Sequence, residues 1–141
     1  MVARVNLVTL GVADVAASTA FYESVGFVRS SGSTPEVSFF RAGPVVLGVW
    51  GRDDLAGDAG LDDPGGVPRG AALAMNVGSE AEVDQVWQSW VDAGATPLKR
   101  PERVFWGGYS SYVADRDGHT WEFAYNPYWP INADGWVDLP E

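Results

Sequence analysis

The chain has 141 residues, no cysteine and a formal net charge of −10. This length fits one compact domain, and the lack of cysteine excludes disulfides, thiolate metal sites and a cysteine nucleophile. The acidic charge and the single lysine argue against a nucleic-acid partner, and with no membrane-length apolar run or export signal we expect a cytoplasmic protein that does not bind membranes.

The first part of the chain predicts a strand, a helix and three further strands. The helix is expected over residues 14–26, where Asp14 can cap its start and Gly26 can end it. The strands are expected from runs of apolar and alternating residues bounded by turn residues. These runs cover residues 4–12, 27–31, 37–43 and 45–50.

Residues 51–69 are rich in glycine, aspartate and proline. Such a composition is typical of a connection between elements and offers few apolar residues to bury. We therefore predict a linker or lid here rather than packed structure.

The second part repeats the same order of elements. A helix over residues 79–94 is signalled by a capping box at Ser79 and Glu82 and by apolar residues at three- and four-residue intervals. Trp87 and Trp90 in this stripe, and Trp121 in a later strand, are expected to be core residues. Strands are predicted for residues 70–77, 96–100, 109–115 and 119–125. The tail, 127–141, has too many breakers for a regular element, but its aromatic residues suggest that it packs on a cleft rim or a dimer partner.

The βαβββ order therefore occurs twice, and the motifs that accompany it resemble one known family. The segments "VTLGVADV" with "AFYESVGF", "ALAMNVGSEAEVDQVWQSWVDAGA" and the hairpin "YVADRDGHTWEFAYNP" are similar to those of the vicinal-oxygen-chelate superfamily. That superfamily includes glyoxalase I, extradiol dioxygenases and bleomycin-resistance proteins. The pattern FWGGYSxYxADxDGHxWE further resembles a glyoxalase-like subgroup.

This resemblance implies an α+β fold in which two βαβββ modules form a cupped mixed sheet, the glyoxalase/bleomycin resistance/dihydroxybiphenyl dioxygenase fold. It implies a single domain over residues 1–141, and it also implies a homodimer. Within that domain, module 1 covers about 4–50, the linker or lid 51–69, module 2 about 70–126 and the C-terminal tail 127–141.

Members of this family take metal ligands from the first and last strands of each module. Carried over by resemblance, these positions are Leu7, Leu47, Ala72 and Glu122, and only Glu122 offers a ligand atom. A lone carboxylate does not hold a divalent ion without about two or three more protein ligands, so we expect no metal cofactor. One divalent metal bound by Glu122 with other residues is the alternative. His119 is expected to be a turn or surface residue facing away from Glu122.

Glu122 is the candidate functional residue because a carboxylate in an aromatic strand needs a partner. Alternation along the strand places Thr120 and Ala124 on the same face, and closing a turn over residues 115–118 sets Ser111 opposite Glu122 and Tyr109 opposite Ala124. Small Ala72 and Ala74 would leave room, and Trp106 beside two glycines would form an aromatic lip. The expected ligand-binding residues are Glu122, Tyr109, Ser111, Trp106, Asn76 and Thr120.

Three functions remain open at this point. The first is a metal-free protein that binds a small molecule and sequesters an aromatic or cationic compound without chemistry. The second is an enzyme of the lyase, isomerase or dioxygenase class, either metal-dependent or with Glu122 as a catalytic general base. The third is a structural or regulatory dimer that binds no ligand, with its cup filled by side chains. For Glu122 itself, the alternative to a ligand-binding role is a vestigial acid hydrogen-bonded to Ser111 or Tyr109.

Overall fold

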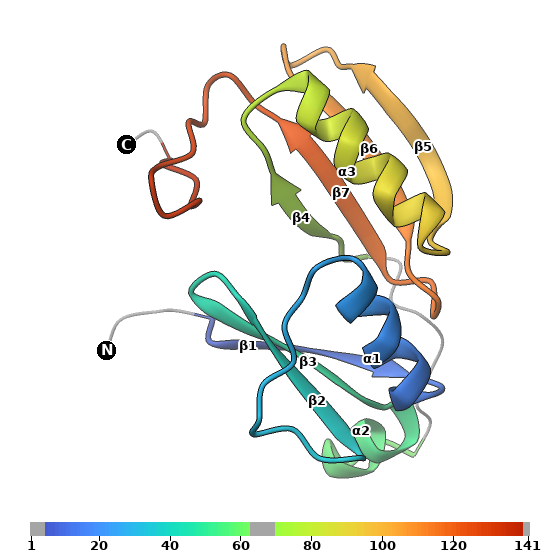
Figure 1. The fold of residues 1–141 in the computed structure, drawn as a ribbon. Helices are drawn as coiled ribbons and strands as arrows, with labels where there is room; N and C mark the ends of the chain where they lie inside the picture. The colour runs from blue at the N-terminus through green and yellow to red at the C-terminus, as the bar shows by residue number, and fades with distance from the viewer. Residues whose placement is uncertain (1–4, 63–69, 140–141) are drawn as a thin grey trace. The chain divides into compact units, whose positions relative to one another are not determined.

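The structure is a computed structural model that describes residues 5–62 and 70–139 (Figure 1). The chain divides into two compact units, Met1–Gly66 and Val67–Glu141. Each unit has a mixed sheet covered by helix, so the predicted α+β class is confirmed. Among the described helices there is none with both the length and the apolar character needed to cross a membrane.

The first unit is built on a sheet with the order β1-β3-β2. Strand β1 (Leu7–Val12) runs parallel to β3 (Val45–Gly51), and β2 (Val37–Ala42) is antiparallel to β3. Helix α1 (Val15–Ser24) packs on this sheet, and the Asp14 side chain caps it by accepting a hydrogen bond from the backbone N–H of Ala17 at 2.9 Å. The core of the unit includes Leu10, Val12, Phe40, Leu47 and Val49.

Two expectations for this unit are wrong. Residues 27–31 do not form a strand, and only Arg29 makes a bridge, to Phe40. The Ser30 hydroxyl accepts a hydrogen bond from the backbone N–H of Gly32, and this local turn ends the pairing after one residue.

The second error concerns the expected linker. Its first part is helix α2 (Arg52–Asp58), which contacts β1 and β3 and buries Ala56. Asp53 and Asp54 lie in its first turn, where carboxylates interact favourably with the helix dipole. The rest of the expected linker falls largely on residues 63–69, which lie outside the described residues.

The second unit has a sheet with the order β4-β7-β6-β5. Its strands are β4 (Leu73–Asn76), β5 (Thr96–Arg103), β6 (Tyr109–Ala114) and β7 (Thr120–Tyr125). β4 is parallel to β7, and the other neighbours are antiparallel. Helix α3 (Glu80–Asp92) begins at Ser79, whose hydroxyl accepts a hydrogen bond from the backbone N–H of Glu82 at 3.2 Å.

Helix α3 covers one face of this sheet (Figure 1). The ring of Trp90 packs against those of Trp121 at 5.0 Å and Phe123 at 4.9 Å between centroids. Trp87 is also buried. The prediction that Trp87, Trp90 and Trp121 are core residues is therefore confirmed. The opposite face of the sheet, which we call the open face, carries the candidate site.

Candidate functional site

Glu122 lies on the open face of the second sheet. Its neighbours Trp121 and Phe123 contact Trp90 of α3, and successive side chains in a strand point to opposite faces. Glu122 is half-buried and pairs with Ala74 of β4 on one side and Tyr112 of β6 on the other. Its carboxylate therefore points away from the core formed with α3.

Two hydroxyl groups of β6 hold the Glu122 carboxylate. The Ser110 hydroxyl donates to Glu122 Oε2 at 2.7 Å, and the Tyr112 side chain is hydrogen-bonded to the same carboxylate. Burial raises the pKa of Tyr112, and the negative charge of Glu122 and this hydrogen bond raise it further. The phenol therefore stays a proton donor at neutral pH, and the carboxylate is fixed by donors from one side.

The register predicted for this hairpin is wrong by one residue. Ser111 pairs with Phe123 and donates to its carbonyl oxygen at 3.1 Å, and Tyr109 pairs with Tyr125. Neither side chain is a partner of Glu122. A shift of one residue moves every side chain of a strand to the other face, so Ser110 and Tyr112 take the places expected for Ser111 and Tyr109.

The cause of the shift is the length of the turn. The strands close at Ala114 and Thr120, so the turn covers residues 115–119 rather than 115–118. Asp115 Oδ1 accepts hydrogen bonds from the backbone N–H groups of Asp117 and His119 at 2.9 and 2.8 Å. An aspartate at the start of a turn is the sequence signal for this arrangement, because its side chain can replace a backbone acceptor.

A pocket of about 490 Å³ lies on this face. It brings together Glu122, Trp106 and Asn76, three of the residues predicted from the sequence. Thr120 lies at the start of β7 outside the lining. The lining residues are Ala74, Asn76, Trp106, Glu122, Ala124, Asn126, Tyr128 and Trp129.

Sequence reasoning missed the part of the pocket that the tail supplies. Asn126, Tyr128 and Trp129 follow β7 directly and add an amide and two aromatic rings. A turn in the tail starts at Asn126, whose Oδ1 accepts a hydrogen bond from the backbone N–H of Tyr128 at 2.9 Å. The aromatic content of the tail was a signal for a cleft rim, but its irregular backbone gives no periodicity from which to place each side chain.

Two glycines let the aromatic walls approach the backbone. A Cβ built on Gly108 would lie 1.8 Å from the Trp106 indole, so that ring lies directly over this glycine. Gly107 has a φ of 92° and would place a Cβ 3.1 Å from the ring of Tyr128. The segment "FWGGY" thus uses its glycines to pack one ring from its own loop and one from the tail.

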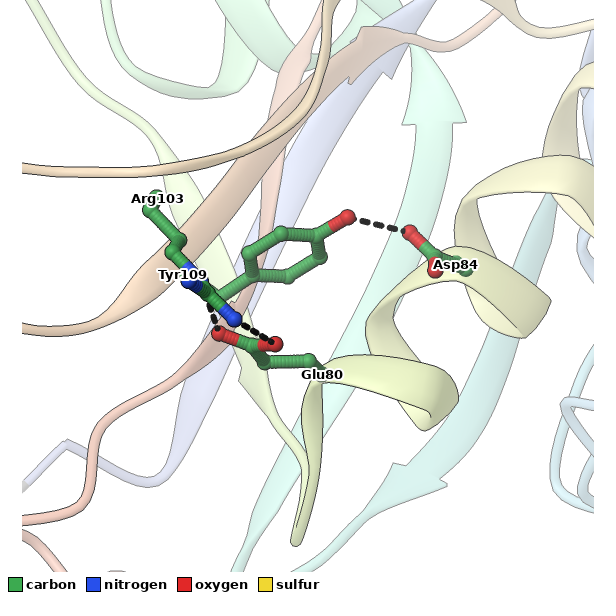
Figure 2. Close-up of polar contacts among 4 residues, drawn as sticks. All are labelled: Glu80, Asp84, Arg103 and Tyr109. Carbon is green, nitrogen blue, oxygen red and sulfur yellow. Dashed lines mark hydrogen bonds and ion pairs between the residues drawn. The ribbon is translucent and has the colours of Figure 1, made fainter.

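Helix α3 anchors both ends of this loop (Figure 2). Before the loop, Arg103 Nε lies 3.1 Å from Glu80 Oε1. After the loop, the Tyr109 hydroxyl donates to Asp84 Oδ1 at 2.8 Å, and this bond is the largest cause of a raised pKa of Tyr109. Tyr109 therefore acts on the helix side of the sheet, as a support for the loop that carries Trp106.

The positions that the family uses for metal ligands do not supply a donor set here. In the first sheet Gly48 pairs with Thr9, and in the second sheet Glu122 pairs with Ala74. Gly48, not Leu47, is therefore the position of the first unit that corresponds to Glu122. The Leu47 assignment is therefore wrong by one residue: its side chain is 2% exposed in the core. Gly48 has no side chain, and the other positions, Leu7 and Ala72, are aliphatic.

No other cluster replaces these ligands among residues 5–62 and 70–139. In that part of the chain, no three His, Cys, Asp or Glu side chains gather in a way that could hold a metal ion. His119 is the last residue of the turn between β6 and β7, as one of its two expected positions had it, and at 8% exposed it is buried there rather than on the surface. The residues present do not fit the divalent ion that the family resemblance implies.

The fold and this site define a class of two-module proteins with an acid on the open face of the second sheet. The chain belongs to the glyoxalase/bleomycin resistance protein/dioxygenase superfamily, whose profile matches residues 4–123. The resemblance to this superfamily is therefore confirmed, and the narrower subgroup pattern stays a prediction. No curated protein matches the chain significantly.

Several solved structures are similar to this chain. A glyoxalase-related enzyme from Fulvimarina pelagi is 38% identical with a TM-score of 0.91, over 99% of this chain and 100% of that one. A glyoxalase/bleomycin resistance protein/dioxygenase family enzyme from Burkholderia phytofirmans PsJN is 23% identical (TM-score 0.75; 87% and 98% covered). Lactoylglutathione lyase from Agrobacterium tumefaciens is 22% identical (TM-score 0.69; 92% and 98%). The last two likenesses show a shared fold alone.

The pairing of Glu122 with Tyr112 can be tested by titration. Glu122→Gln removes a negative charge beside the phenol, so the pKa of Tyr112 should fall toward its ordinary value, with burial still keeping it raised. The measurement is phenolate absorbance against pH, with the titration of a Tyr112→Phe variant subtracted to assign the signal. An unchanged Tyr112 titration in Glu122→Gln would contradict the register described above.

The packing of Trp106 on Gly108 can be tested by adding one methyl group. Gly108→Ala would force the indole from its position, and we expect a loss of about 1–3 kcal/mol in the free energy of unfolding. The measurements are denaturant unfolding and the shift of one indole N–H resonance. Gly57→Ala is the matched control, because a Cβ there meets no atom within 4 Å, and in helix α2 it should stabilise by up to about 1 kcal/mol. Equal behaviour of the two variants would rule out the proposed packing.

Proposed function

We propose that this protein is a metal-free binding protein that sequesters a small compound with a cationic amine and an aromatic ring. The observation that carries the proposal is the Glu122 carboxylate in a pocket with Trp106, Tyr128 and Trp129 on its walls. The partner is thus a small molecule, and no cofactor is required for binding. A homodimer remains an expectation from the family.

The electrostatics of the pocket favour a cation. Ser110 and Tyr112 donate to the carboxylate and keep it in place, while Glu122 still lines the pocket with its remaining acceptor capacity. Charge pairing is stronger in a partly desolvated pocket than in water. The net charge of −10 also attracts cations at long range.

The walls favour a flat ring next to that cation. Trp106, Tyr128 and Trp129 supply aromatic faces that stack on planar groups and attract cations electrostatically. The side chains of Ala74 and Ala124 are single methyl groups, so they leave space in the middle of the pocket. A volume of about 490 Å³ suits a compound of drug-like size.

The side chains at the family's metal-ligand positions favour metal-free binding over the metal chelation of the family. Leu7, Gly48 and Ala72 leave Glu122 without the companion ligands that a divalent ion needs. The hydrogen bonds from Ser110 and Tyr112 offer the carboxylate a different set of partners. A protonated amine would complete that set without an ion.

The test is calorimetric titration with para-methylphenethylamine at neutral pH, where the amine is protonated. We expect saturable binding by the natural sequence and a loss of about tenfold to a hundredfold in affinity in Glu122→Gln, since hydrogen bonds to charged groups contribute about 1.5–3 kcal/mol.

Glu36→Gln is the control, because it removes the same charge from an exposed position in the first unit. Absence of binding by the natural sequence, or an equal loss in both variants, would contradict the proposal. Recovery of the probe unchanged after incubation separates binding from turnover.

A further inference from the structure

The pocket has two chemically different ends, and this difference specifies the ligand further. Resting on the proposed function, we propose that the ligand carries a neutral hydrogen-bond acceptor, such as a carboxamide carbonyl, on the side of its ring opposite the amine. The amine meets Glu122, and the acceptor meets the side-chain amide of Asn126.

The orientation of the Asn126 amide is fixed by its backbone neighbour. The backbone N–H of Tyr128 lies 2.9 Å from Asn126 Oδ1, and an N–H group can only donate, so the oxygen of the amide is committed to the turn. The Nδ2 group has no hydrogen-bond partner among the described residues and belongs to a side chain that lines the pocket. This end of the pocket therefore offers donors.

The two ends are separated by a floor of small residues. Glu122, Ala124 and Asn126 are spaced two residues apart along β7 and its continuation, so they share the open face. A strand rises about 3.3 Å per residue, which places the Cα atoms of Glu122 and Asn126 about 13 Å apart. Between them lies the methyl group of Ala124, beside Asn76 of β4. A flat ring over this floor would extend one substituent toward each end.

The charges of the pocket define the acceptor as neutral. A second ammonium group at the Asn126 end would meet the Nδ2 donors, because the hydrogen bond from Tyr128 turns Oδ1 toward the backbone of the tail. A carboxylate could accept from Nδ2, but Glu122 in the same pocket and the net charge of −10 would repel it. A carbonyl oxygen satisfies the donor without this repulsion. Asn76 accommodates either group, since its amide is not fixed by a hydrogen bond within the described residues.

The experiment compares three matched probes by calorimetry: para-(aminoethyl)benzamide with both groups, para-methylphenethylamine with the amine alone, and para-ethylbenzamide with the amide alone. We expect the natural sequence to bind the first about tenfold more tightly than the second, the size of one good hydrogen bond. The amide alone should bind most weakly.

Asn126→Asp separates the donor from the turn. The variant keeps an oxygen for the N–H of Tyr128 but replaces Nδ2 with a carboxylate oxygen, so the tenfold preference should disappear while para-methylphenethylamine binds as tightly or more tightly. Asn132→Asp is the control for a new carboxylate in the tail, although Asn132 Nδ2, unlike Asn126 Nδ2, donates a hydrogen bond, to Asp138 Oδ1 at 3.4 Å. Asn132 Oδ1 also accepts backbone N–H groups, those of Asp134 and Trp136, and lies outside the pocket lining. The preference should be unchanged in this control.

The outcomes distinguish this inference from the proposed function. Equal affinity of the natural sequence for the two amines, with Glu122→Gln weakening both, would overturn the role of Asn126 and leave amine binding in place. A tenfold preference that survives in Asn126→Asp would also overturn that role. Failure of all three probes to bind would overturn both proposals.

Discussion

The packing of helix α3 on one face of the second sheet determines the rest of the site. Trp90 contacts Trp121 and Phe123, and this contact fixes which side of β7 is core. Because side chains alternate along a strand, Glu122 between them must point to the opposite face. The same helix holds the ends of the Trp106 loop through Glu80 and Asp84. One amphipathic helix thus sets both the direction of the acid and the place of the aromatic wall.

The open face carries a carboxylate at one family ligand position without donor side chains at the other three. In the first unit the position that matches Glu122 is Gly48, which pairs with Thr9, and the family position in β1 is the aliphatic Leu7, so neither family position of that sheet carries a donor side chain. In the second unit Ser110 and Tyr112 hold the carboxylate from β6. The tail then adds Tyr128 and Trp129 to the lining of the pocket that contains Glu122.

Much of this arrangement could be predicted from sequence, and the errors have a common physical cause. The caps at Asp14 and Ser79 and the two-residue alternation of β7 act locally, so the helices and the facing of Glu122 were predictable. The register of a hairpin depends on the length of its turn. Because this turn is one residue longer than expected, Ser110 rather than Ser111 is a partner of Glu122. Likewise, the register of β1 with β3 makes Gly48, not Leu47, the position that corresponds to Glu122. Helix α2 and the tail have no clear periodicity, so tertiary packing decides their place.

The most direct measurement is the metal content per chain of protein expressed with added manganese, iron, nickel, cobalt and zinc and purified without chelator. If the Glu122 carboxylate binds an organic cation rather than a metal ion, the metal content should be near zero, and Glu122→Gln should not change it. Near one equivalent of a metal, lost in Glu122→Gln, would contradict this account and assign the pocket to a metal centre.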